Sequence, residues 1–89
     1  MVVTVRDLPP GGVVPLHRHR WQRYAYVEKG RIRMIVPETG LDRVSEPGEI
    51  IAEPRGQWHE GRVVGDEPVR LIVFEQVPPG ESNMEMKPD

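Results

Sequence analysis

The chain contains three histidines, and two of them are separated by a single residue. His17 and His19 lie in a segment typical of a β-strand, and His59 lies much further along the chain. Because a strand directs alternate side chains to the same face, His17 and His19 would present two imidazoles to one space. A third imidazole from a neighbouring strand would complete a set of nitrogen ligands suited to zinc, iron, nickel, copper or manganese. The spacing therefore predicts a divalent transition-metal site with open positions for water or substrate.

These histidines belong to two longer motifs of glycine, proline and histidine. The fixed positions are Gly11, His17, His19, Gly30, Gly48, Pro54, Gly56 and His59. From Leu8 to Glu75 the chain resembles the small single-domain cupins, whose motifs read G-x5-HxH-x3,4-E-x6-G and G-x5-PxG-x2-H-x3-N. Two motif positions differ, because Arg23 replaces the glutamate and Val63 replaces the asparagine.

The resemblance implies an all-β fold, the double-stranded β-helix or jelly-roll barrel of the cupins. It also implies that the motif histidines lie in the barrel interior. Cupins include oxygenases, isomerases, decarboxylases, lyases, transcriptional sensors and storage proteins. Since one fold carries many functions, the activity must be inferred from the site itself.

The elements that would position the histidines are short strands. Ten prolines and nine glycines divide the chain into brief segments, and sustained helical periodicity is missing. The expected strands span residues 1–7, 13–19, 23–28, 31–36, 41–45, 50–53, 59–64 and 69–77. We therefore expect one barrel domain over residues 1–77. Residues 78–89 are polar and contain prolines, which favours a loosely ordered tail.

Arg23 is the informative departure from the cupin motif. Strand alternation directs positions 23, 25 and 27 to the interior and Tyr24 and Tyr26 to the other side. A guanidinium cannot ligate a metal, and it would repel a divalent ion about 5 Å away by roughly 6–7 kcal/mol at a dielectric near 20. Either Arg23 leans onto a carboxylate, or metal binding is weak, or an anionic ligand lies between them. In the third case Arg23 would bind a substrate carboxylate bidentately.

Other side chains near the motif histidines are candidates for substrate binding. Trp21 and Trp58 could form an aromatic wall, although a role in packing or in a dimer interface is the alternative. The amide of Gln22 could reach the site if the turn after His19 is one residue longer. A fourth metal ligand could come from one of three further carboxylates, although each is expected to be a solvated surface charge: Glu53, Glu60 and Glu75.

Composition narrows the class of protein without naming an activity. A chain of 89 residues makes one small domain, which favours a homodimer as a means of burying more surface. There is no cysteine for a disulfide or a thiolate ligand. A net charge of −2 with dispersed basic residues gives no reason to expect nucleic acid. Neither an export signal nor a membrane-spanning stretch is visible, so we expect a cytoplasmic protein.

Two functional hypotheses from different classes follow. In the first, His17, His19 and His59 hold a metal in an enzyme that acts on a small organic acid, with Arg23 binding the acid. In the second, the chain is a non-catalytic small-molecule-binding cupin whose metal site is degenerate or empty, because Arg23 replaces the acidic ligand. A metal-free isomerase of the sugar-epimerase type is a third option, but no spacing identifies its base and acid. No catalytic residue is assigned.

Overall fold

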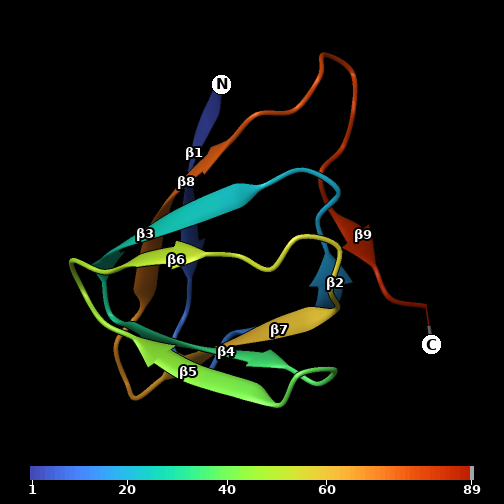
Figure 1. Cartoon of the computed structure of the whole chain (residues 1–89). Coiled ribbons are helices and arrows are strands. Elements are labelled where there is room, and N and C mark those ends of the chain that lie inside the picture. The colour runs from blue at the N-terminus through green and yellow to red at the C-terminus, as the bar shows by residue number, and fades with distance from the viewer. Residues whose placement is uncertain (89) are drawn as a thin grey trace.

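The computed structural model describes residues 1–88, which form strands joined by turns (Figure 1). The strands are β1 (Val2–Leu8), β2 (Val13–Arg18), β3 (Arg23–Lys29), β4 (Arg31–Val36), β5 (Leu41–Ser45), β6 (Ile50–Ala52), β7 (His59–Val64), β8 (Val69–Glu75) and β9 (Glu85–Met86). They make two antiparallel sheets, which confirms the predicted all-β jelly roll. Among the described residues, no helix has the length and apolar character needed to cross a membrane.

The order of the strands brings the two sequence motifs together. One sheet has the order β1-β8-β3-β6, and the other has the order β5-β4-β7-β2-β9. The first motif covers β2 and β3, and the second covers β6 and β7. Because β3 pairs with β6 and β2 pairs with β7, each motif contributes one strand to each sheet (Figure 1). The motif side chains that point inward therefore meet between the sheets.

Strand alternation determines which side chains fill the space between the sheets. On β3, Arg23, Ala25 and Val27 are buried, whereas Tyr24 is 46% exposed on the opposite face. This agrees with the predicted inward positions. The buried apolar cluster comprises Ala25, Val27, Ile32, Ile51, Val69, Leu71 and Val73. These side chains come from β3, β4, β6 and β8, so the apolar core lies between the sheets and borders the histidines.

The segment after Val77 differs from the loosely ordered tail that its polar composition favours. It returns to the five-stranded sheet, where Met86 pairs with His17 and Glu85 pairs with Arg18 (Figure 1). Asn83 is only 7% exposed. Polar groups of this segment form hydrogen bonds to the barrel, among them the Asn83 side chain to Trp21 and Glu75. The last residue of the predicted tail, residue 89, lies outside the described residues.

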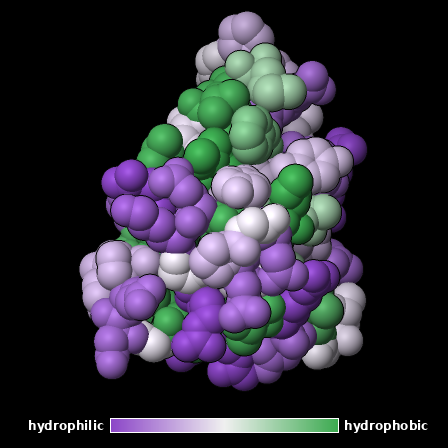
Figure 2. Space-filling model, turned by 90° about the vertical axis from the view of Figure 1, so that its left-hand side faces the viewer, coloured by the Kyte–Doolittle hydropathy of each residue, from purple (hydrophilic) through white to green (hydrophobic). Residues whose placement is uncertain are grey.

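The outer face of the four-stranded sheet carries apolar side chains. These side chains form two rows across the strands. One row contains Val3, Phe74, Tyr24 and Ala52, and the other contains Val5, Ile72, Tyr26 and Ile50. Val5 is 57% exposed and Ile50 is 65% exposed. Figure 2 shows hydrophobic atoms gathered in the upper part of one side of the molecule and hydrophilic atoms covering the lower part. The homodimer expected from the sequence stays a prediction, and this face is the apolar surface available for it.

Gly30 is the motif glycine whose conformation and surroundings both exclude a side chain. It forms the turn between β3 and β4 with a φ of 74°. A Cβ at this position would overlap the carbonyl oxygen of Pro68 and the side chain of Val69. Gly11 has the same φ of 74°, but a Cβ there would meet nothing within 4 Å among the described residues. The first motif therefore ends at a glycine that the packing of two turns requires.

Replacing these two glycines should separate backbone strain from steric overlap. We expect Gly11→Ala to lower the free energy of unfolding by about 1 kcal/mol, since only the left-handed backbone is penalised. Gly30→Ala should cost at least about 2 kcal/mol more, because the Pro68 carbonyl must also move. Urea unfolding followed by tryptophan fluorescence measures both values. Equal losses in the two variants would contradict the proposed overlap.

Candidate metal centre

The three histidines lie together in the barrel interior. His17 is on β2, His19 follows the end of that strand, and His59 begins β7 opposite His17. Their exposed fractions are 4%, 1% and 2%. The ring centroids are 4.3 Å apart for His17 and His59 and 4.9 Å apart for the other two pairs. The motif spacing therefore does bring three imidazoles into one buried space.

Each imidazole is oriented by a main-chain carbonyl. The Nδ1 atoms of His17, His19 and His59 lie 2.6, 2.8 and 2.9 Å from carbonyl oxygens. The carbonyls belong to Pro15, Asn83 and Gln57, respectively. A carbonyl oxygen only accepts hydrogen bonds, so each Nδ1 must carry the proton and donate it. The Nε2 atoms are left as the ligating atoms, which is the arrangement that orients histidines at metal centres.

Glu53 is the fourth member of the cluster, and the prediction that it is a solvated surface charge is wrong. It follows β6 directly, and its side chain is only 12% exposed. Its Oε1 lies 3.1 Å from Nε2 of His19 and 3.3 Å from Nε2 of His59. The ligand atoms of His17, His19, His59 and Glu53 all lie within 4.8 Å of one another. The sequence contained a signal for the inward position of Glu53. Side chains two residues apart on a strand share a face, so Glu53 points to the same side as the buried Ile51.

The chemistry of this donor set fits a bound cation. With their protons on Nδ1, the Nε2 atoms of His19 and His59 present lone pairs to a carboxylate oxygen, which is also an acceptor. Acceptors this close require a proton or a metal ion between them. Ligands about 2.1 Å from one ion, at angles of 90–110°, would be roughly 3.0–3.4 Å apart. The observed 3.1 and 3.3 Å fall in that interval. Three nitrogens and one oxygen suit a divalent transition metal.

The environment sets the charge states of two members of the cluster. Burial lowers the pKa of His17 to about 4, and repulsion by His59 and His19 adds to this effect. Burial alone would raise the pKa of Glu53, but proton-mediated hydrogen bonds with His19 and His59 and the charge of Arg23 outweigh it. The pKa of Glu53 is therefore held below its ordinary range. A neutral imidazole and an ionised carboxylate are the forms that bind metals.

Arg23 leans onto the carboxylate of Glu53, which is the first of the three alternatives considered from the sequence. Its Nε lies 2.9 Å from Oε2, and the main-chain N–H of Glu53 donates to the carbonyl of Arg23 at 3.0 Å. The Nε–H is not aligned with the oxygen, so the contact is a close ion pair without a hydrogen bond among the described residues. Arg23 thus stands where the cupin motif has its glutamate, and Glu53 supplies a carboxylate from the neighbouring strand. The ion pair offsets the repulsion that an unpaired Arg23 would exert.

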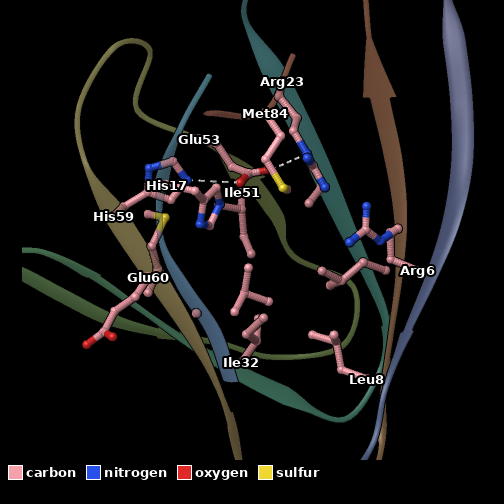
Figure 3. Close-up of a pocket in the computed structure, with 15 residues that line it drawn as sticks. Arg6, Leu8, His17, Arg23, Ile32, Ile51, Glu53, His59, Glu60 and Met84 are labelled. Carbon is pink, nitrogen blue, oxygen red and sulfur yellow. Dashed lines mark hydrogen bonds and ion pairs between the residues drawn. The ribbon is translucent and has the colours of Figure 1, made fainter. Parts of the chain in front are cut away.

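A cavity of about 50 Å³ extends from this cluster between the sheets (Figure 3). His17, Arg23, Glu53 and His59 line one end. Apolar side chains make up much of the remaining wall, including Leu8, Ile32, Ile51 and Leu71. Arg6 and Met84 also line the cavity, and neither was singled out from the sequence. The space is therefore small, largely apolar and bounded by charged groups.

Three of the predicted substrate-binding residues do not line this cavity: Trp21, Gln22 and Trp58. Trp21 and Gln22 line a separate surface hollow, and the Gln22 amide donates to the carbonyls of Glu53 and Arg23 at 2.9 and 3.2 Å. The ring of Trp58 lies 4.4 Å from the guanidinium carbon of Arg18. Of the four residues proposed from the sequence, Arg23 lines the cavity beside the histidines. Trp21, Gln22 and Trp58 lie in the loops just before β3 and β7, outside the strands that line the cavity.

The architecture and the histidine cluster agree with the comparison to known protein families. A model of the cupin domain matches residues 4–75. The chain belongs to the cupin family. The resemblance drawn from the two motifs is confirmed. No curated protein matches this cupin in sequence.

Solved structures of longer proteins contain the same fold as this cupin. The polyketide cyclase RemF from Streptomyces resistomycificus is 36% identical, with a TM-score of 0.70 over 88% of this chain and 56% of its own. A conserved double-stranded β-helix protein from Klebsiella pneumoniae is 24% identical, with a TM-score of 0.78 over 99% and 75% of the two chains. Oxalate oxidase in complex with glycolate is 28% identical, with a TM-score of 0.70 over 80% and 39%. This cupin therefore spans only about half of RemF and less of oxalate oxidase.

The lowered pKa of His17 makes the stability of the metal-free cupin depend on pH. The unfolded chain takes up a proton on His17 near pH 6.5, whereas the folded protein resists it until about pH 4. Stability should therefore fall as the pH decreases through this window, by up to about 1.4 kcal/mol per pH unit. Urea unfolding of chelator-treated protein at pH 7 and pH 5 measures the change. His17→Gln should show a weaker dependence, and a wild-type stability equal at both pH values would contradict the prediction.

Proposed function

We propose that this cupin is a metal-dependent enzyme that acts on a small organic acid. His17, His19, His59 and Glu53 would hold a divalent transition metal, whose identity among zinc, iron, nickel, manganese and copper is open. The observation that carries the proposal is the orientation of the donors. Carbonyl bonds fix the Nδ1 protons, so that Nε2 of His19 and of His59 face the same carboxylate oxygen.

The relocated carboxylate favours a functional metal centre over the degenerate site that Arg23 suggested from the sequence. A degenerate centre would lack an acidic ligand, but Glu53 presents Oε1 to the imidazoles while Arg23 occupies Oε2. The two charges of this ion pair cancel, which leaves the site suitable for a cation. The alternative, a small-molecule-binding cupin without a metal, is distinguished by the metal measurements below.

Three observations support a small acid as the substrate. Two arginines, Arg6 and Arg23, line the cavity. Its volume of about 50 Å³ accommodates only roughly three to five water-sized groups. Oxalate oxidase, whose structure was solved with its substrate analogue glycolate, is 28% identical to this cupin. These features favour acids of a few carbon atoms.

The side chains of the proposed site would have distinct roles. The four ligands hold the ion, which when bound would supply a Lewis acid to polarise a substrate oxygen. Arg23 orients the carboxylate of Glu53, so that one oxygen faces the imidazoles. The apolar wall formed by residues such as Leu8, Ile32 and Leu71 limits the access of water. Exclusion of water strengthens the electrostatic interactions within the cavity.

Metal affinity tests the proposal directly. We expect the wild type to bind one divalent ion, and we expect Glu53→Gln to weaken that binding by at least about tenfold, because a charged ligand becomes neutral. Isothermal titration of chelator-treated protein with Zn²⁺, Ni²⁺ and Mn²⁺ gives both values. Protein purified without an affinity tag or added metal should also contain a transition metal by elemental analysis.

Glu60→Gln is the matched control for this variant. Glu60 also lines the cavity, but its carboxylate lies 3.4 Å from Arg62 and is directed away from the cluster (Figure 3). Its replacement should leave metal affinity unchanged. A wild type that binds none of the ions would contradict the metal centre and favour the metal-free alternative. Equal affinity in the wild type and Glu53→Gln would exclude Glu53 as a ligand.

A further inference from the structure

Arg6 is directed into the cavity from the edge of the four-stranded sheet. It lies on β1 opposite Leu71, and residues paired across a sheet share one face. Since Leu71 is buried in the core, Arg6 is also on the inner face. Figure 3 shows its guanidinium group pointing into the cavity from β1, on the same wall as Arg23. Arg6 was not among the substrate-binding residues expected from the sequence.

The two arginines of the cavity differ in their partners. Arg23 lies 2.9 Å from Glu53, which is ionised and balances its charge. Among the described residues, no carboxylate lies within ion-pair distance of Arg6. Arg6 is itself exposed at the edge of the sheet, and apolar side chains such as Leu8 and Leu71 line the cavity with it. The cavity therefore carries one positive charge without a protein counter-charge, which favours an anion.

We propose that Arg6, and not Arg23, binds the carboxylate of the substrate. The inference rests on the proposed function and narrows its substrate class. With a carboxylate at Arg6, a second oxygen of the ligand would be the group suited to the proposed metal ion. The volume of about 50 Å³ favours a ligand of a few non-hydrogen atoms. The substrate class is thus a short hydroxy, oxo or dicarboxylic acid of about two to four carbons.

Binding of small acids to Arg6 variants tests this assignment. Glycolate, oxalate, malonate and acetate would be titrated into metal-free and metal-loaded protein and followed by NMR chemical shifts. Arg6→Gln should weaken acid binding by at least tenfold and leave the affinity for Zn²⁺ unchanged. Arg6→Lys should give an intermediate loss, because it keeps the charge without the two-pronged donor. Arg70→Gln, which removes a cation from the outer face of the same sheet, should change neither quantity.

The outcomes separate this inference from the proposed function. If the metal-free wild type binds an acid and Arg6→Gln abolishes that binding, the role of Arg6 is supported even if no metal binds. Acid binding that is the same in the wild type and Arg6→Gln overturns the inference and leaves the metal centre intact. A wild type that binds none of the four acids, with or without metal, overturns both the role of Arg6 and the acid substrate.

A second inference comes from Asn83, which is buried beside the histidine cluster. Its side-chain oxygen accepts from the main-chain N–H of Trp21 at 2.8 Å, and its amide donates to the Trp21 carbonyl at 3.1 Å and to Glu75 at 2.8 Å. Its own main-chain carbonyl accepts from Nδ1 of His19 at 2.8 Å. The side chain thus fixes the main-chain group that orients a metal ligand.

We infer that Asn83 is a positioning residue for His19. His17 and His59 bond to carbonyls two residues before them, whereas His19 depends on a carbonyl 64 residues away. That carbonyl belongs to a segment outside the matched cupin domain of residues 4–75. If Asn83 is displaced, His19 should lose its fixed tautomer while the other two imidazoles keep theirs. The C-terminal segment is therefore part of the metal centre.

Imidazole NMR tests this role without requiring a metal. In long-range ¹H–¹⁵N spectra of metal-free wild type, His19 should carry a hydrogen-bonded proton on Nδ1. In Asn83→Asp, which cannot donate to Trp21 or Glu75, His19 should show averaged tautomers while His17 and His59 are unchanged. Zn²⁺ affinity should fall by about 10–100-fold. Glu85→Gln removes the exposed Arg18–Glu85 ion pair from the same segment and should alter neither readout.

An unchanged His19 spectrum in folded Asn83→Asp would overturn the inference. Equal changes in all three histidines would also overturn it, because they would indicate general loosening of the barrel. If Asn83→Asp does not fold, Asn83→Ser, which keeps an acceptor for Trp21, provides the same comparison.

Discussion

The carboxylate of Glu53 is the group on which the rest of the site depends. One of its oxygens lies 2.9 Å from Arg23, and the other lies 3.1 and 3.3 Å from His19 and His59. A buried charge is costly unless it is paired, and breaking such a pair leaves its partners uncompensated. Because Arg23 balances Glu53, the cluster can remain ionised next to an apolar cavity. The same pairing frees the second oxygen for a cation.

The main chain of the barrel supplies the geometry of this cluster. Strand β3 pairs with β6, and the hydrogen bond from the Glu53 N–H to the Arg23 carbonyl continues that pairing by one step. The two side chains therefore leave neighbouring strands at the same level. This closeness explains how the acidic position of the cupin motif can be exchanged. A carboxylate from either strand reaches the same region, so an arginine on one strand and a glutamate on the next retain a negative oxygen beside the histidines.

Local sequence was sufficient for the strands, the histidines and the motif glycines. Alternation along a strand is a short-range property, so the inward positions of His17, His19 and Arg23 follow from their spacing. The two-residue spacing from Ile51 also indicated that Glu53 points inward, but the groups that surround Glu53 could not be known from sequence. The aromatic wall expected from Trp21 and Trp58 is not part of the cavity. Proximity to a motif histidine along the chain does not imply proximity in space, since both tryptophans lie in loops outside the strands that line the cavity.

By itself, the sequence determined the cupin family, the double-sheet architecture and the three imidazoles that share one space. Only the tertiary structure decided which carboxylate joins them, which partner Arg23 takes, and how the C-terminal segment contributes through Asn83. The physical reason is that these contacts join residues on different strands. Their distances depend on sheet pairing and on burial, which change the charge state of Glu53 and the orientation of His19. Composition and spacing describe each strand separately and contain no measure of such contacts.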